Sequence, residues 1–131
     1  MSNCRLILFD LDGVTINTEH LYARAETMLF AEYGVTIPDN DWKLFRGCSE
    51  EIFYSLSMDR YEIKEERSVF MKKGRDLILK EFEKHLDFMP GFKGLIKKIN
   101  KYYKIGLVTA TPEHMFRWLD KKLHLCSIFE H

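Results

Sequence analysis

An apolar run that ends in two acidic residues constrains this chain more than any other feature of its sequence. Residues 5–9, Arg-Leu-Ile-Leu-Phe, precede Asp10, Leu11, Asp12 and Gly13. A nearly continuous apolar run of this length is typical of a strand buried on both faces of a parallel sheet. The acids then lie at the carboxyl end of the strand, where ligands bind in open α/β sheets. The pattern predicts an α/β fold of Rossmann-like type with a site at this strand end.

A second strand is predicted over residues 104–108, and it delivers Thr109, Ala110 and Thr111 to its own carboxyl end. Pro112 is then expected at the first position of a helix. Parallel pairing would bring the two strand ends together. The Thr109 hydroxyl and the amides of Ala110 and Thr111 would form a phosphate clamp, because unpaired N–H groups and the helix dipole favour an anion there. For Thr111 the favoured interpretation is structural, as a helix N-cap.

The stretch between these strands has helical periodicity and no strand signal. We expect a helix from Thr18, a plausible N-cap, to Gly34, a short helical piece before Gly47, a helix capped by Ser49, and a long helix over residues 63–86. The predicted domains are an α/β core, residues 1–16 and 89–131, and an inserted helical-bundle cap, residues 17–88.

Composition excludes several classes of function. The 20 basic and 20 acidic residues cancel, so no net field attracts nucleic acid or an anionic membrane. The basic and aromatic stretch 97–104 is interpreted as a solvated helix face followed by a strand. Three cysteines without CxxC spacing indicate neither a disulfide framework nor a zinc site, and the N-terminal apolar run is too short for a membrane span. We therefore expect a cytoplasmic protein.

Asp10 and Asp12 are the candidate catalytic residues. Alternation along an extended strand sends both carboxylates to the same side, where they repel each other unless a cation or a proton intervenes. Mg²⁺ suits such an oxygen site and would also neutralise phosphate. Asp10 could attack phosphorus to give an aspartyl-phosphate, and Asp12 could protonate the leaving oxygen and later deprotonate water.

The stretch 9–14, Phe-Asp-Leu-Asp-Gly-Val, followed by Thr18-Glu19, resembles the first motif of the haloacid dehalogenase superfamily, in its phosphoglycolate phosphatase and β-phosphoglucomutase-like branch. Pro90-Gly91 and the stretch 106–111 resemble the lead-in and second motif of that branch. The resemblance implies Asp10 as nucleophile, Asp12 as acid/base, Thr109 and the Ala110 amide as phosphate ligands, and Mg²⁺ held by Asp10 and the Asp12 carbonyl.

Several residues have two interpretations. Asp12-Gly13 alone would equally suit a hairpin turn. Arg46 lies in the loop that faces substrate in this branch. It is either a substrate contact or an arginine that is solvated or salt-bridged. Glu19 and His20, close to the cap hinge, are further candidates for substrate contact, although a partly exposed helix histidine is the simpler description. His124 and Cys126 are too few to make a metal site.

The function expected from the sequence is a Mg²⁺-dependent phosphohydrolase acting on a small phosphorylated metabolite. One alternative is a phosphomutase. Mutases of this branch carry a histidine at the cap hinge, where this chain has Tyr22 as the nearest match, and this weighs against the alternative. Another is a non-catalytic binding or regulatory remnant, since the family's lysine and further acidic cluster do not occur.

Two strands cannot form a sheet buried on both faces. We therefore expect a second chain or a missing C-terminal segment to complete the core, and the isolated chain to be at most weakly active.

Overall fold

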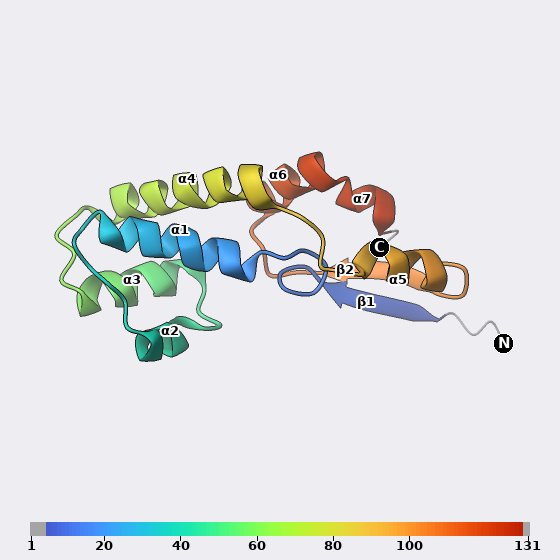
Figure 1. Ribbon diagram of the computed structural model, residues 1–131, viewed down its shortest axis with the longest axis horizontal. Coiled ribbons are helices and arrows are strands. Elements are labelled where there is room, and N and C mark those ends of the chain that lie inside the picture. Colours follow the sequence, from blue (N-terminus) through green and yellow to red (C-terminus); the bar gives the residue numbers. More distant parts are fainter. Residues whose placement is uncertain (1–4, 130–131) are drawn as a thin grey trace. The chain divides into compact units, whose positions relative to one another are not determined.

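The computed structural model describes residues 5–129 and divides the chain into two units. The first unit combines Met1–Glu19 with Asp87–His131, and the second is His20–Leu86. Both strands belong to the first unit, and residues 20–86 form helices and connecting loops (Figure 1). The role of the helical unit as a cap stays a prediction.

The sheet of the first unit consists of β1, Leu6–Asp10, and β2, Lys104–Val108. The strands are parallel and pair in register from Leu6 opposite Lys104 to Asp10 opposite Val108. This pairing confirms the predicted α/β fold with a parallel sheet, and the hairpin interpretation of Asp12-Gly13 is wrong. Helix α5, Phe92–Ile99, precedes β2. The carboxyl ends of both strands therefore lie side by side, as the sequence predicted.

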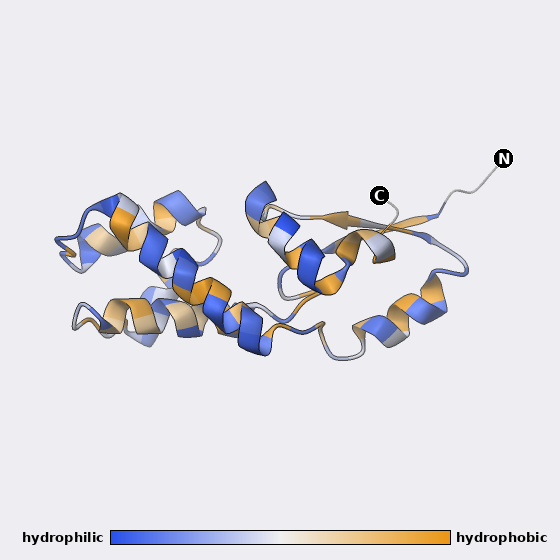
Figure 2. Ribbon diagram, turned by 90° about the horizontal axis from the view of Figure 1, so that it is seen from above, coloured by the Kyte–Doolittle hydropathy of each residue, from blue (hydrophilic) through white to orange (hydrophobic). Residues whose placement is uncertain are grey.

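The two faces of β1 differ in burial. On one face the Phe9 ring packs against Phe92, with ring centroids 5.6 Å apart, and against Phe129 at 6.2 Å. On the other face Leu6 and Leu8 are 48% and 58% exposed, although both strands are strongly hydrophobic (Figure 2). The expectation of a strand buried on both faces is therefore wrong for the described chain. Side chains alternate across a strand, so a two-stranded sheet covered on one side leaves every second residue in solvent.

A tight loop follows β1 within the first unit. Gly13 has φ +72°, a left-handed conformation that favours glycine. The loop is closed by hydrogen bonds from the Thr15 and Ile16 amides to the Leu11 carbonyl, at 2.9 and 3.0 Å. Leu11, Thr15 and Ile16 are fully buried. The loop is thus an ordered part of the first unit's core rather than a flexible connection.

Two helices follow β2, namely α6, Glu113–Leu123, and α7, Leu125–Ile128. Pro112 is the N-cap of α6 with ψ 143°, so the prediction that it occupies the first helical position is wrong by one residue. Leu119 and Leu125 are fully buried. Both helices therefore contribute an apolar side chain to the core of the first unit.

The second unit contains four helices: α1, Glu19–Ala31; α2, Asp39–Phe45; α3, Glu50–Arg60; and α4, Arg67–His85. Gly34, at φ +70°, ends the first of these, with the Val35 amide bonded to the Phe30 carbonyl at 3.0 Å. Ser49 caps α3 as predicted, because its Oγ accepts from the Ile52 amide. Within residues 5–129 the structure shows no helix that combines the length and hydrophobicity needed to cross a bilayer.

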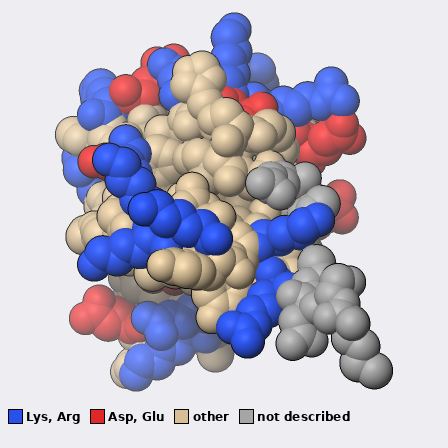
Figure 3. All heavy atoms as spheres, turned by 90° about the vertical axis from the view of Figure 1, so that its right-hand side faces the viewer, with Lys and Arg blue, Asp and Glu red and all other residues tan. Residues whose placement is uncertain are grey.

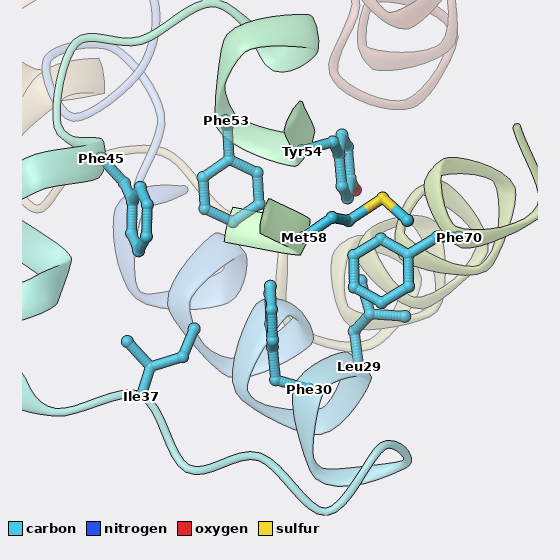
Figure 4. Packing of buried hydrophobic residues seen from close by; sticks show 8 residues of the cluster. All are labelled: Leu29, Phe30, Ile37, Phe45, Phe53, Tyr54, Met58 and Phe70. Carbon is cyan, nitrogen blue, oxygen red and sulfur yellow. The ribbon is translucent and has the colours of Figure 1, made fainter. Parts of the chain in front are cut away.

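The core of the helical unit is rich in aromatic rings (Figure 4). The Phe30 ring makes edge-to-face contacts with Phe53 and Phe70, with centroids 6.3 and 5.3 Å apart. Tyr54 contacts Phe70 in the same way at 5.7 Å. Edge-to-face contacts of this kind stabilise a core beyond the area they bury. The helical unit is therefore held together by its own side chains.

Candidate active site

Asp10 is the last residue of β1 and its side chain is exposed. Its carbonyl accepts a hydrogen bond from Thr15 Oγ1 at 2.6 Å, and its Oδ1 accepts from the Leu11 amide at 2.7 Å. The buried Thr15 hydroxyl thus fixes the backbone that carries the carboxylate. An exposed carboxylate on a fixed backbone at a strand end suits a group that must reach a ligand.

Asp12 is held by two threonine hydroxyls. Thr18 Oγ1 donates to Oδ1 at 2.6 Å, and Thr111 Oγ1 donates to Oδ2 at 2.9 Å. Thr18 is fully buried, and Thr111 is partly buried. The bond from Thr111 joins the loop after β1 to the loop after β2, and so it brings the two candidate segments together.

Thr109 and Thr111 are bonded to each other. Thr109 Oγ1 donates to Thr111 Oγ1 at 2.8 Å and accepts from the Thr111 amide at 3.0 Å. Ala110 lies between them and is exposed. The favoured interpretation of Thr111 as an N-cap is wrong, because Pro112 occupies that position and the Thr111 hydroxyl donates to Asp12. Thr109 and Ala110 lie three or four residues before α6 begins at Glu113, within the segment where an anion would meet the positive end of the helix dipole.

Glu19 belongs to the first unit and lies against the loop that carries Asp12. A Cβ built on Gly13 would come within 3.0 Å of Glu19 Oε1, so this carboxylate lies close against the glycine. Glu19 is itself exposed and is the first residue of α1. Its position beside Gly13 is compatible with a contact to substrate, which stays a prediction.

His20 and Arg46 belong to the helical unit. His20 is exposed in the first turn of α1. This agrees with the simpler interpretation, an exposed helix histidine. Arg46 follows α2 as its C-cap, with an extended backbone and an exposed side chain. The assignment of both residues to substrate binding stays a prediction.

The basic residues of the stretch 97–104 lie at the surface. Lys97, Lys98, Lys101 and Lys104 are exposed, and Figure 3 shows lysine and arginine side chains spread over the face seen from the right-hand side of Figure 1. A pocket of about 290 Å³ lies on α5 and α7, lined by Phe92, Lys93, Ile96, Lys97, Asn100 and Ile128. It contains none of the predicted catalytic residues.

Two threonine hydroxyls of the site make contacts that the sequence did not predict. Thr18 directly precedes α1, in agreement with its predicted N-cap position, and its hydroxyl donates to Asp12. Thr111 is 99 residues from its acceptor. The one sequence signal for this hydrogen bond is the Thr-x-Thr pattern directly after a predicted strand. A hydroxyl at a strand end beside two carboxylates is expected to find an acceptor.

Comparison with known proteins agrees with this geometry. The family model described as "Haloacid dehalogenase-like hydrolase" matches residues 7–131. A curated relative, the phosphorylated carbohydrates phosphatase of Thermotoga maritima, is 28% identical over 125 residues, which are 95% of this chain and 58% of the relative. The chain therefore spans a little over half the length of that relative.

Solved structures give the same picture. A "putative beta-phosphoglucomutase" from Thermotoga maritima superposes with a TM-score of 0.78 at 26% identity, covering 95% of this chain and 58% of the other. The "putative HAD-hydrolase YfnB" from Bacillus subtilis, solved bound to magnesium, superposes with a TM-score of 0.68 at 16% identity over 96% of this chain and 62% of the other, which shows the fold alone. With the family model matching nearly the whole sequence, and with the motifs at the carboxyl ends of β1 and β2, this chain belongs to the haloacid dehalogenase-like hydrolase family.

Proposed function

We propose that this chain provides the nucleophile half of a Mg²⁺-dependent phosphohydrolase site that acts on a small phosphorylated metabolite. The observation that carries the proposal is the hydrogen bond between Thr111 and Asp12, which joins the acidic end of β1 to the threonine-bearing end of β2. A carboxylate pair on one side and hydroxyl and amide donors on the other are the groups that phosphoryl transfer needs. Because the chain spans 58% of the curated relative, the activity of a longer protein is part of the same proposal.

Each residue has a distinct task in this proposal. Asp10 attacks phosphorus, forming an aspartyl-phosphate as the ester oxygen leaves. Asp12 gives its proton to that oxygen, and then takes a proton from the water that hydrolyses the intermediate. Thr109 and the Ala110 amide donate hydrogen bonds to the phosphoryl oxygens. These donors matter most as charge builds on the oxygens in the transition state.

The oxygens at the end of β1 suit a magnesium ion. No group of three or more acidic, histidine or cysteine side chains gathers within residues 5–129, but Mg²⁺ is commonly bound by one or two carboxylates together with phosphate and water. Asp10 and the Asp12 carbonyl would hold it, because the Asp10 carboxylate is exposed at the end of β1 and carboxylate and carbonyl oxygens suit Mg²⁺. Such an ion would neutralise charge on the phosphate and on the nucleophile.

The substrate class is inferred from the name of the curated relative. The curated relative is named for phosphorylated carbohydrates, and we place a sugar phosphate first among the candidate substrates. The helical unit would act as a cap that excludes water during transfer, with Arg46, Glu19 and His20 as candidate contacts to the part of the substrate beyond the phosphate. Cys48 and Cys126 are free, which supports the proposal that the protein works in the reducing cytoplasm.

Two other functions are possible in principle. A phosphomutase would use the same Asp10 chemistry, and one structural neighbour has such a name. The residue matched to the mutase histidine, however, is Tyr22, whose ring packs edge-to-face on Phe82 with centroids 5.2 Å apart. This packing role favours the phosphatase. A non-catalytic remnant would bind phosphate without forming a covalent intermediate.

The test is the covalent intermediate itself. With magnesium and an activated phosphate ester, the unmodified chain should gain one phosphoryl group on Asp10, detected by mass spectrometry of a rapidly quenched reaction. Asp10→Asn should remove this signal while leaving the circular dichroism spectrum unchanged, because the amide keeps the shape but cannot attack phosphorus. Excess EDTA should also prevent labelling, since the charges cannot assemble without a cation. A phosphoryl group on another residue, or labelling in EDTA, would refute the proposal.

A further inference from the structure

The peptide unit between Asp10 and Leu11 is hydrogen-bonded at both of its polar groups. The Asp10 carbonyl accepts from Thr15 Oγ1 at 2.6 Å, and the Leu11 amide donates to Asp10 Oδ1 at 2.7 Å. This carbonyl and this amide belong to the same planar unit and point in opposite directions. A bond that fixes the carbonyl therefore also fixes the amide that holds the carboxylate.

The Thr15 hydroxyl reaches this carbonyl at the open edge of β1. The Lys104 amide of β2 donates to the Arg5 carbonyl at 2.8 Å. Carbonyls alternate in direction along a strand, so the Asp10 carbonyl, an odd number of residues further on, points away from β2. Within residues 5–129, β2 is the one strand that pairs with β1. The Asp10 carbonyl is thus bonded by a side chain rather than by a neighbouring strand.

Thr15 is itself held in place by its backbone. Its amide donates to the Leu11 carbonyl at 2.9 Å, and its carbonyl accepts from the Met89 amide at 2.9 Å. The residue is fully buried, and all of these partners belong to the first unit. Its hydroxyl is therefore a fixed point to which the Asp10 carbonyl is bonded.

We propose that Thr15 is a positioning residue that holds the Asp10 carboxylate in the orientation for attack on phosphorus. Through the shared peptide unit, the Thr15 hydroxyl keeps Oδ1 on the Leu11 amide. The other oxygen, Oδ2, has no hydrogen-bond partner within residues 5–129, and it is the oxygen that forms the bond to phosphorus. Oδ1 keeps a second lone pair for a cation. This inference rests on the proposed function, in which Asp10 is the nucleophile.

A hydroxyl with only a structural role would behave differently. Buried carbonyls normally have a hydrogen-bond partner, and Thr15 would then supply that bond without any effect on the carboxylate. Its loss would lower the stability of the chain and leave the rate of phosphoryl transfer per folded molecule unchanged. Ser57 has such a role in the helical unit, where it is fully buried and donates to the Tyr54 carbonyl at 3.3 Å. It provides the matched control.

Rapid-quench labelling with p-nitrophenyl phosphate and Mg²⁺ measures the attack itself. Oδ2 bonds to phosphorus as the bond from phosphorus to the ester oxygen breaks, and the electron pair leaves on p-nitrophenolate, so the step needs no proton. Thr15→Val removes the hydroxyl and keeps the shape. Its labelling rate per folded chain should fall about 10-fold or more, as expected for a misplaced reacting group. The ester concentration that gives half the maximal rate should stay similar, because Thr15 is buried and does not touch the phosphate.

Two further variants separate positioning from folding. Thr15→Ser, which keeps the hydroxyl, and Ser57→Ala should both be labelled at a rate close to that of the unmodified chain. An unchanged rate in Thr15→Val, or an equal loss in either of these variants, would overturn the inference and leave the proposed function standing. If Thr15→Val does not fold, Thr15→Ala replaces it, and failure of both to fold would assign the hydroxyl to folding and overturn the inference. No label on Asp10 in the unmodified chain would overturn both proposals.

A second measurement does not depend on turnover. The couplings between the α and β protons of Asp10, measured by NMR on the full chain, report whether its side chain occupies one staggered rotamer or averages over several. The unmodified chain, Thr15→Ser and Ser57→Ala should show the couplings of one rotamer, and Thr15→Val should show averaged values. Couplings of one rotamer in Thr15→Val, or averaged couplings in the unmodified chain, would overturn the positioning role without affecting the assignment of Asp10 as nucleophile.

Discussion

Glu26 is a partly buried carboxylate in the middle of α1. Burial raises its pKa to about 7. The neighbouring phenol of Tyr54 also has a raised pKa, first because it is buried and then because Glu50 and Glu26 carry negative charge near it. Glu50 is paired with Arg75 at 2.7 Å, so Glu26 is the acid of this group whose ionisation opposes folding.

We predict that Glu26 makes the helical unit less stable as pH rises. Between the ordinary value of 4.5 and the raised pKa of about 7, the folded chain binds more protons than the unfolded chain, so the free energy of unfolding falls with rising pH. Glu26→Gln replaces the carboxylate by a neutral amide of the same shape, so the free energy of unfolding should depend less steeply on pH. Near pH 8 this free energy should be about 1 to 3 kcal/mol higher in the variant than in the unmodified chain. Urea unfolding at several pH values measures it, with the exposed Glu83→Gln as control. Equal slopes in Glu26→Gln and the unmodified chain would contradict the prediction.

At the residue scale the sequence predicted Asp10, Asp12 and Thr109 as site residues but not the hydrogen bonds around them. Asp10 and Thr109 each lie directly after an apolar run, and Asp12 follows two residues after Asp10. Thr18 and Thr111 bond to Asp12 through side chains that no periodicity connects, and one of these contacts spans 99 residues. A contact of that kind depends on the register of β1 and β2, which the sequence alone does not specify.

At the scale of elements, the close packing of α3 and α4 depends on Gly74. A Cβ built on this glycine would lie 2.0 Å from Tyr54 Oη and 2.9 Å from its Cζ. The glycine is buried in the middle of α4. A residue that weakens a helix is therefore placed where the ring of the neighbouring helix needs the space.

We predict that Gly74→Ala destabilises the helical unit by about 1 to 3 kcal/mol, the usual range for overpacking. Alanine has the better helix propensity, by about 1 kcal/mol, so propensity alone predicts the opposite sign. Gly94→Ala in α5, where nothing lies within 4 Å of the added Cβ, is the matched control and should be neutral or stabilising. Thermal unfolding provides the measurement.

A second substitution identifies the clashing atom. Tyr54→Phe removes the hydroxyl that an alanine at 74 would meet first, so the double variant should recover part of the stability lost in Gly74→Ala. If the stability loss of the double variant equals the sum of the losses of the two single variants, the Tyr54 hydroxyl is not the cause of the clash.

The bounds of β2 were predicted correctly, whereas the start of α4 was not. The long helix was expected from Ile63 and begins at Arg67. Glu62 has φ +51°, and the Ile63 amide bonds to the Met58 carbonyl at 3.0 Å. This arrangement terminates α3 as a glycine would. Because a glutamate occupies the left-handed position, the sequence contains no signal for the break.

At the scale of the whole molecule, the sheet has few neighbours. Within residues 5–129 it consists of two strands, and Leu6, Leu8 and Val108 are 48%, 58% and 57% exposed. The matched relatives are longer, since this chain covers 58% of the curated phosphatase. We propose that further polypeptide covers these residues, either a C-terminal segment or a second chain, because parallel sheets are normally buried on both faces.

We predict that the isolated 131-residue chain self-associates through this sheet and is at most weakly active. Exposed strand edges and apolar patches promote association. Leu8→Lys should reduce the associated fraction in sedimentation velocity runs across a range of protein concentrations. Leu44→Lys, a leucine equally exposed at 56% in the helical unit, should not. A monomer at all concentrations, or an equal effect of the two substitutions, would show that the sheet is not the associating surface.

The two connections of the helical unit are bonded to each other within the first unit. The Asn17 amide donates to the Asp87 carbonyl at 2.9 Å, the Met89 amide donates to the Thr15 carbonyl at 2.9 Å, and Ile16 pairs with Phe88. Chain entry and exit are thus fixed as neighbours by backbone groups alone, which is the geometry that tolerates inserted domains. Evolution or engineering could therefore exchange the residues between them for a helical module of another size, or for a short linker, without re-routing the strands that carry the acids and threonines.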